Sequence, residues 1–105
     1  MRTLEFTVNG QRLKKKIDCD FSGIVAGSVG YLRAKFYFSE EWDGCKKAAS
    51  FWRYGFEYAS ILDENNSCLI DGDALTDDHF HVSVTGVKEG YSIKSGKTKV
   101  RQEVY

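Results

Sequence analysis

Two histidines spaced two positions apart, His79 and His81, are the residues of this sequence most suited to binding a metal ion. In an extended strand both imidazoles project from the same face, and Asp77 and Asp78 immediately precede them. Such pairs are commoner as polar residues on a solvated strand face. The neighbouring aspartates lack the spacing of a calcium-binding EF-hand loop and are better explained as caps and loop residues. We therefore expect no metal and no other cofactor.

No arrangement typical of nucleophilic catalysis or phosphate binding is present. The sequence contains neither GxSxG nor HExxH, and nothing marks a serine or cysteine as an activated nucleophile. The segment Gly96-Lys97-Thr98 is similar to the end of a phosphate-binding loop, but the first glycine of that motif would fall at Tyr91. The chain is therefore predicted not to be an enzyme.

The cysteines, Cys19, Cys45 and Cys68, are also unsuited to a structural site. They are odd in number and form no CxxC pair, which argues against both a zinc site and a disulfide framework. We expect free thiols in a reducing compartment. Cys68 lies between Ser67 and Leu69 and is predicted to be a buried, small apolar residue.

Charge and hydropathy argue against two further classes of partner. The chain has 15 basic and 15 acidic residues, so it lacks the basic excess typical of nucleic-acid-binding proteins. The run Lys14-Lys15-Lys16 is interpreted as a solvated strand end. No apolar run approaches the length of a membrane span, and residues 1–10 lack the pattern of a signal peptide. We expect neither nucleic acid nor membrane as a partner, and a location in the cytoplasm of the cell that makes the protein.

Short strands, separated by turns rich in glycine, asparagine and aspartate, must position all of these residues. Asn9-Gly10 lies between two alternating segments and predicts a hairpin with a type I′ turn. One helical turn is expected within residues 71–75. Alternation also predicts strands at residues 31–38, 46–53, 56–62, 68–70, 79–85, 91–94 and 98–104. The prediction is a single all-β domain, residues 1–105, folded as a small antiparallel β-sandwich that is immunoglobulin-like or barrel-like.

Three aromatic residues, Tyr37, Trp52 and Tyr54, point away from the core on this alternation. Exposed tryptophan and tyrosine often mark protein interfaces or sugar-binding platforms, although neighbouring elements can also cover them. We predict that the aromatic face around Tyr37 and Trp52 contacts a partner protein, with Tyr54 beside it. Trp42 follows a strand and lies in a connection, so it is expected to close one end of the core.

The segment Phe38-Ser39-Glu40-Glu41-Trp42-Asp43-Gly44 resembles a motif of small β-sandwich proteins encoded in phages and prophages of Firmicutes. Further matching segments are residues 5–11, 47–51, 58–68, 80–87 and 98–104, so the resemblance covers nearly the whole chain. Members of this family occur alone or at the front of tail- and baseplate-associated proteins, which implies a virion structural or accessory role without enzymatic activity. The sequence departs from the family at Asp71-Gly72, at Cys45 and in residues 94–99, and the resemblance supplies no binding residues.

Three functions are compatible with these observations. The first is a phage-encoded protein-binding module of the virion or its assembly, which contacts phage proteins through a sheet face or edge and is able to associate with itself. The second is a small inhibitor of a host defence system, such as an anti-CRISPR protein, that acts by protein–protein binding. The third is a carbohydrate-binding module that uses Trp52 and Tyr54. The first two functions place the protein in the host bacterial cytoplasm or in the virion.

Overall fold

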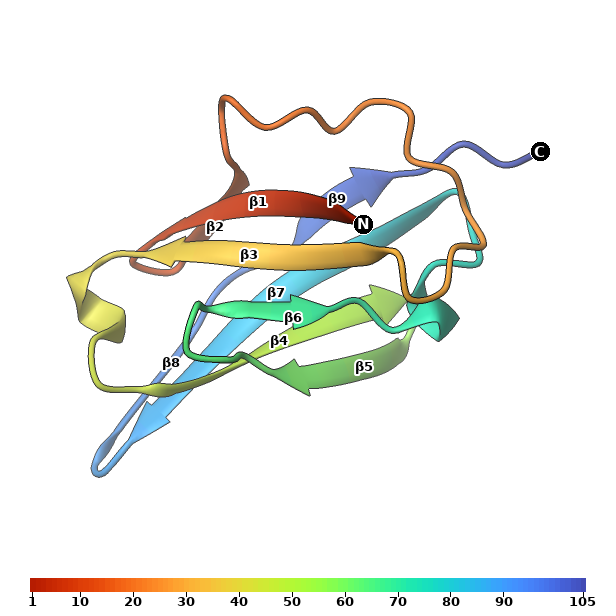
Figure 1. Ribbon diagram of the computed structural model, residues 1–105. Helices are drawn as coiled ribbons and strands as arrows, with labels where there is room; N and C mark the ends of the chain where they lie inside the picture. The colour runs from red at the N-terminus through yellow and green to blue at the C-terminus, as the bar shows by residue number, and fades with distance from the viewer.

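The alternating segments form nine strands and two single 3₁₀ turns in a computed structural model that describes residues 1–105 (Figure 1). The first sheet has the order β2-β1-β3-β6. Its strands are β1 (Arg2–Asn9), β2 (Arg12–Lys15), β3 (Leu32–Phe38) and β6 (Ser67–Leu69). The second sheet has the order β5-β4-β7-β8, with β9 also paired to β7. Its strands are β4 (Lys46–Arg53), β5 (Phe56–Ile61), β7 (His79–Lys88), β8 (Tyr91–Lys94) and β9 (Thr98–Arg101).

The all-β prediction is confirmed, and helical structure is limited to η1 (Glu40–Trp42) and η2 (Gly72–Ala74). The η2 turn falls within the segment expected to hold one helical turn, and the Asp71 side chain accepts the Asp73 backbone N–H at 2.9 Å. No helix of this fold has the length and apolar character needed to cross a bilayer.

One strand pair departs from the expected antiparallel arrangement. Strands β1 and β3 run parallel, in a register that extends from Arg2 opposite Leu32 to Val8 opposite Phe38. The irregular connection between β2 and β3 returns the chain to the starting end of β1 (Figure 1), where the Arg2 N–H donates to the Tyr31 carbonyl at 2.9 Å. Alternation predicts which side chains share a face but not which strands are neighbours, so this pair was not predictable from the pattern.

The core lies between the two sheets and consists of the inward-facing positions of the alternating segments. Its largest fully buried side chains are Trp42, Phe6, Phe36, Phe51, Phe80, Leu4, Leu32, Ile70, Leu75, Val8, Val82 and Val84. The Phe6 and Phe36 rings stack across β1 and β3 with their centroids 5.3 Å apart. Trp42 is completely buried at one end, as predicted, and its indole Nε1 donates to the Gly10 carbonyl at 2.8 Å.

The structure places two local features at other residues than the sequence predicted: the turn of the first hairpin and the end of β9. The first hairpin pairs Asn9 with Arg12, so its central residues are Gly10 and Gln11 rather than Asn9 and Gly10. Of these, only Gly10 has a positive φ, +60°, which matches a type II′ turn and not the expected type I′. Strand β9 ends at Arg101 instead of residue 104, because Arg101 pairs with His79, the first residue of its partner strand β7.

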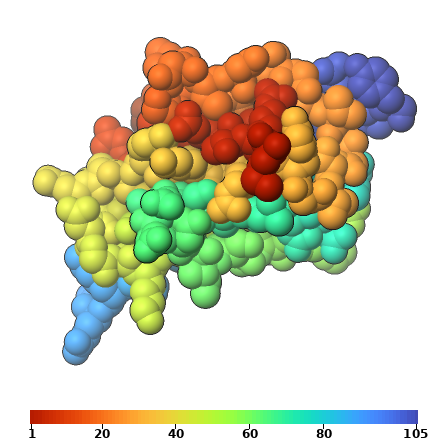
Figure 2. Space-filling view, viewed as in Figure 1, coloured from red at the N-terminus to blue at the C-terminus, as the bar shows by residue number.

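The two sheets approach each other at both edges, which gives the sandwich its barrel-like character. Beside β2, the Thr98 hydroxyl donates to the Leu13 carbonyl at 2.5 Å and the Gly96 N–H donates to the Gln11 carbonyl at 3.0 Å. On the other side, β5 contacts β6 through a turn in which the Asp63 N–H donates to the Ser67 carbonyl at 2.9 Å. The β7–β8 hairpin projects beyond this body (light blue in Figure 2).

Candidate protein-binding surface

Trp52 lies on the outer face of the second sheet, between His81 on β7 and Glu57 on β5. The side chain is half-buried, and its indole Nε1 donates to the Ser83 hydroxyl at 2.9 Å. The ammonium of the exposed Lys97 lies 3.7 Å from the ring centroid, in the geometry of a cation–π contact. One edge of the indole is therefore held by β7 and one face is covered by a flexible cation. A sugar ring that stacked on this face would have to displace Lys97.

Tyr54 is adjacent to this group, in the two-residue turn between β4 and β5. Its side chain is 70% exposed, and its ring makes an edge-to-face contact with His79 at 6.0 Å between centroids. His79 in turn contacts His81 edge-to-face at 5.3 Å. We call the group formed by Trp52, Tyr54, His79, His81 and Lys97 the Trp52 surface. It brings together two of the three aromatic residues predicted to bind a partner.

Lys97 supplies the permanent charge of the Trp52 surface. Nδ1 of His79 donates to the Asp78 carboxylate at 2.7 Å, and this hydrogen bond lowers the pKa of Asp78. Burial lowers the pKa of His81, and electrostatic interactions with His79, Lys97 and Lys99 lower it further. His81 is consequently neutral at neutral pH. No group of three histidine, cysteine, aspartate or glutamate side chains that could hold a metal ion gathers in the structure.

Tyr37 does not share this surface, because it lies on β3 of the first sheet, where its side chain is 41% exposed on the outer face. Its hydroxyl donates to the Glu5 carboxylate at 2.6 Å, a bond that raises the pKa of Tyr37. The ammonium groups of Lys16 and Lys35 lie 5.4 and 5.3 Å from its ring centroid. The single aromatic face expected around Tyr37 and Trp52 does not form, because alternation assigned both side chains to an outer face without showing that the faces belong to different sheets.

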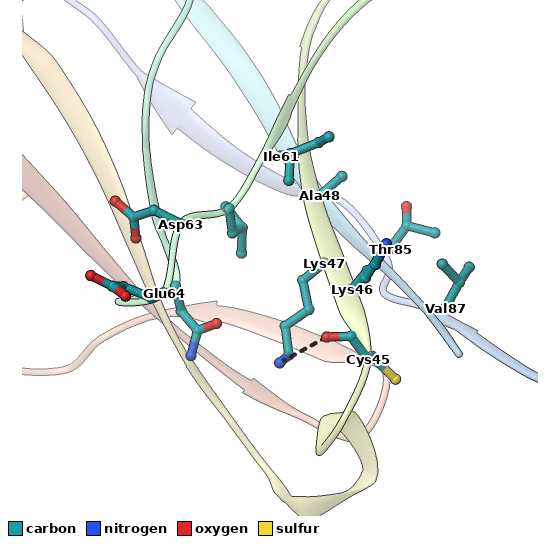
Figure 3. Close-up of a pocket in the computed structure, with 11 residues that line it drawn as sticks. Cys45, Lys46, Lys47, Ala48, Ile61, Asp63, Glu64, Thr85 and Val87 are labelled. Carbon is teal, nitrogen blue, oxygen red and sulfur yellow. Dashed lines mark hydrogen bonds between the residues drawn. The ribbon is translucent and has the colours of Figure 1, made fainter. Parts of the chain in front are cut away.

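The largest hollow in the surface, about 810 Å³, lies beside the ends of β4 and β5 and was not anticipated from the sequence (Figure 3). Its exposed apolar residues are Ile61, which is 83% exposed and lies opposite Ala48, and Val87, which is 48% exposed and lies opposite Lys46. Asp63 and Glu64 lie on the wall opposite Thr85 and Val87 in Figure 3. The signal in the sequence was the alternation of Phe56–Ile61, which ends on a large apolar residue in the outward register.

The backbone of Tyr54 supplies the first testable prediction. Tyr54 has a φ of +54°, in the left-handed region that disfavours residues with a Cβ atom. Tyr54→Gly should raise the free energy of unfolding by up to about 1 kcal/mol, because glycine adopts this conformation without steric cost. Tyr54→Ala keeps the strain and loses the contact with His79, so it should not stabilise the protein. Urea unfolding of both variants checks the prediction, which is wrong if glycine gives no gain over alanine.

Comparison with solved structures identifies a similar fold in a phage protein. The structure described as "N-terminal domain of phage TP901-1 ORF48" matches with a TM-score of 0.50, over 99% of this chain and 98% of that chain, at 11% sequence identity. No protein-family model matches the sequence. No curated protein matches it either. The similarity therefore establishes a shared fold: this chain has, along its whole length, the β-sandwich fold of a domain from a phage protein.

Proposed function

We propose that this chain is a phage-encoded, non-enzymatic protein-binding module that serves in virion structure or assembly. The observation that supports the proposal is the match to the N-terminal domain of phage TP901-1 ORF48, which covers essentially all of both chains. A complete domain of the same fold in a phage protein agrees with the resemblance of the Phe38–Gly44 motif to phage and prophage proteins. A role in the tail or baseplate is the finer form of the same proposal.

The Trp52 surface is the face that we propose to contact the partner protein. Tryptophan and tyrosine provide large contact areas at small entropic cost and are enriched among the residues that dominate binding energies. Tyr54 projects from a turn, while Trp52 is held in place by Ser83, so one residue is accessible and the other is preorganised. Lys97 is exposed beside these two aromatic residues. A partner surface complementary to this face would therefore combine apolar side chains with acidic ones.

An affinity pull-down from phage-infected host lysate tests the function and the surface together. The tagged chain should retain phage structural proteins, whereas the double variant Trp52→Ala/Tyr54→Ala should lose most of this binding. Truncation of a central interface aromatic typically costs at least about 2 kcal/mol, which is roughly a thirtyfold loss of affinity. The matched control is Tyr37→Ala, which removes an outward aromatic residue from the other sheet and should bind like the unaltered chain.

Each alternative outcome of this pull-down has a definite meaning. Retention of a host nuclease or signalling enzyme, and of no phage protein, would contradict the structural role and identify the chain as an inhibitor of host defence. If the double variant retains phage proteins as well as the unaltered chain does, the structural role is supported but the Trp52 surface is rejected as the contact. Loss of binding in Tyr37→Ala alone would move the contact to the first sheet.

A further inference from the structure

Strand β5 has a free edge whose backbone groups have no partner within the chain. It lies at the end of the second sheet and pairs only with β4. The Leu62 N–H donates to the Lys47 carbonyl at 2.9 Å, which shows that the even-numbered residues of this segment bond toward β4. The N–H and C=O groups of Glu57, Ala59 and Ile61 therefore point to the other side, and none of the hydrogen bonds outside the strand ladders involves them.

This edge lacks several of the features that usually prevent strands from pairing with other chains. Edge strands are commonly protected by proline, lysine, a bulge or a covering element. β5 contains no proline or lysine, and its pairing with β4 is continuous from Phe56 to Ile61. Phe56 is 64% exposed and Ile61 is 83% exposed. The one charged side chain, Glu57, accepts a hydrogen bond from the Ser50 hydroxyl of β4, so its carboxylate is directed away from the edge.

We propose that the β5 edge is a self-association site, at which β5 of a second copy adds antiparallel and the two second sheets become continuous. The exposed donors and acceptors require an extended strand as the occupant, and the sequence of β5 is complementary to itself in one register. In that register Ala59 lies opposite the partner's Ala59 on the two-fold axis, and Glu57 lies opposite the partner's Ile61. Every outward N–H and C=O of these three residues then finds a partner.

The chemistry of the side chains selects this register over its neighbours. Centring the pair on Glu57 would place two carboxylates directly opposite each other, which is destabilising. Centring it on Ile61 would bring Ala59 against the partner's Asp63, whose N–H is already bonded to the Ser67 carbonyl at 2.9 Å within its own chain. In the register centred on Ala59, no like charges lie opposite each other. Ile61 then has the partner's Ala59 as a diagonal apolar neighbour.

Sedimentation across about a hundredfold range of protein concentration tests the association. The unaltered chain should shift from monomer to dimer as its concentration rises. Ile61→Glu should remain monomeric, because in this register the new carboxylate lies directly opposite the partner's Glu57, and the exposed position disturbs no buried contact. The matched control, Val87→Glu, adds the same charge to the same outer face away from the edge and should dimerise normally. A chain that is monomeric at every concentration would overturn the proposal.

Cysteine cross-linking tests the register in a Cys19→Ser background, which removes the least buried native thiol. Opposed residues in a hydrogen-bonded antiparallel pair have Cα atoms about 5.5 Å apart, which suits a disulfide. Ala59→Cys should therefore form a covalent dimer on mild oxidation, whereas Glu57→Cys should not. Cross-linking of Glu57→Cys instead would reject the register. Because Ile61 and Ala59 lie outside the Trp52 surface, failure of either test leaves the proposed binding of phage proteins unaffected.

Discussion

Replacing Trp42 with alanine is expected to lower the free energy of unfolding by about 3–5 kcal/mol, which is a large part of the stability of a domain of this size. The side chain is fully buried, and its ring lies 5.0 Å from that of Phe38 between centroids. Its Nε1 donates to the Gly10 carbonyl, so the substitution would also leave this acceptor without its partner. The indole thus joins the β1–β2 turn to the end of β7, and alanine would leave a cavity there.

Gly86 on β7 provides the reciprocal test of this packing. A Cβ atom at Gly86 would lie 2.8 Å from Cε3 and 3.0 Å from Cζ3 of Trp42, and 3.2 Å from the Cys45 Cβ. Gly86→Ala should therefore destabilise the protein by about 1–3 kcal/mol through overpacking. In a Trp42→Phe background the smaller ring should relieve the clash, so the two substitutions should combine to less than the sum of their separate effects.

Guanidinium-induced unfolding, followed by circular dichroism, measures these changes. The control is Val87→Ala, one position beyond Gly86, where the side chain is 48% exposed and the change should stay within about 0.5 kcal/mol. A loss below about 1 kcal/mol for Trp42→Ala would show that the indole does not close the core as described. Strict additivity of Gly86→Ala and Trp42→Phe would likewise show that the two residues are not in energetic contact.

The second large effect concerns the reactivity of Cys68 toward thiol reagents. Cys68 is 5% exposed and lies opposite Ala34 on β3, and burial raises the pKa of its thiol to about 12. Only about one molecule in ten thousand would then carry the reactive thiolate at pH 8. We expect Cys68 to be modified at least about a hundredfold more slowly than the partly exposed Cys19 in the folded protein, and at a similar rate after unfolding.

Mass spectrometry of tryptic peptides after timed alkylation separates the individual cysteines. The pH dependence gives a further check, because the rate at Cys68 should keep rising with pH well beyond the point at which an unperturbed thiol is fully ionised. Rapid modification of Cys68 at neutral pH would mean that β6, the three-residue edge strand that carries it, opens readily from the first sheet.

Much of the local structure was predictable from the sequence, because alternation and turn chemistry are local properties. Val82 and Val84 are buried on β7, and Trp42 closes one end of the core as expected. Tyr54-Gly55, the two residues between the predicted strands 46–53 and 56–62, form the turn that joins β4 to β5. The first hairpin was predicted correctly but with its turn one residue too early, because Asn9-Gly10 is the pair preferred by a type I′ turn, whereas pairing of Asn9 with Arg12 places Gly10 first in the turn.

The candidate surface was predictable only in part. Tyr37, Trp52 and Tyr54 were each assigned correctly to positions outside the core, yet Tyr37 lies on the first sheet and the other two on or beside β4 of the second. Lys97 is far from Trp52 in the sequence, and it reaches the indole because the segment between β8 and β9 passes beside that face. The free edge of β5 was not predictable either, because it exists only through the position of β5 at the end of the second sheet.

The sequence by itself determined which side chains of the strands face the core, roughly where the chain turns, and that the fold is all-β. Those properties follow from a two-residue period and from the conformational preferences of glycine, asparagine and aspartate, which act between near neighbours. Only the tertiary structure decided the parallel pairing of β1 and β3, the separation of Tyr37 from Trp52, and the exposure of the β5 edge. Strand order depends on long-range pairing between segments, and a two-residue period carries no information about which strand lies next to which.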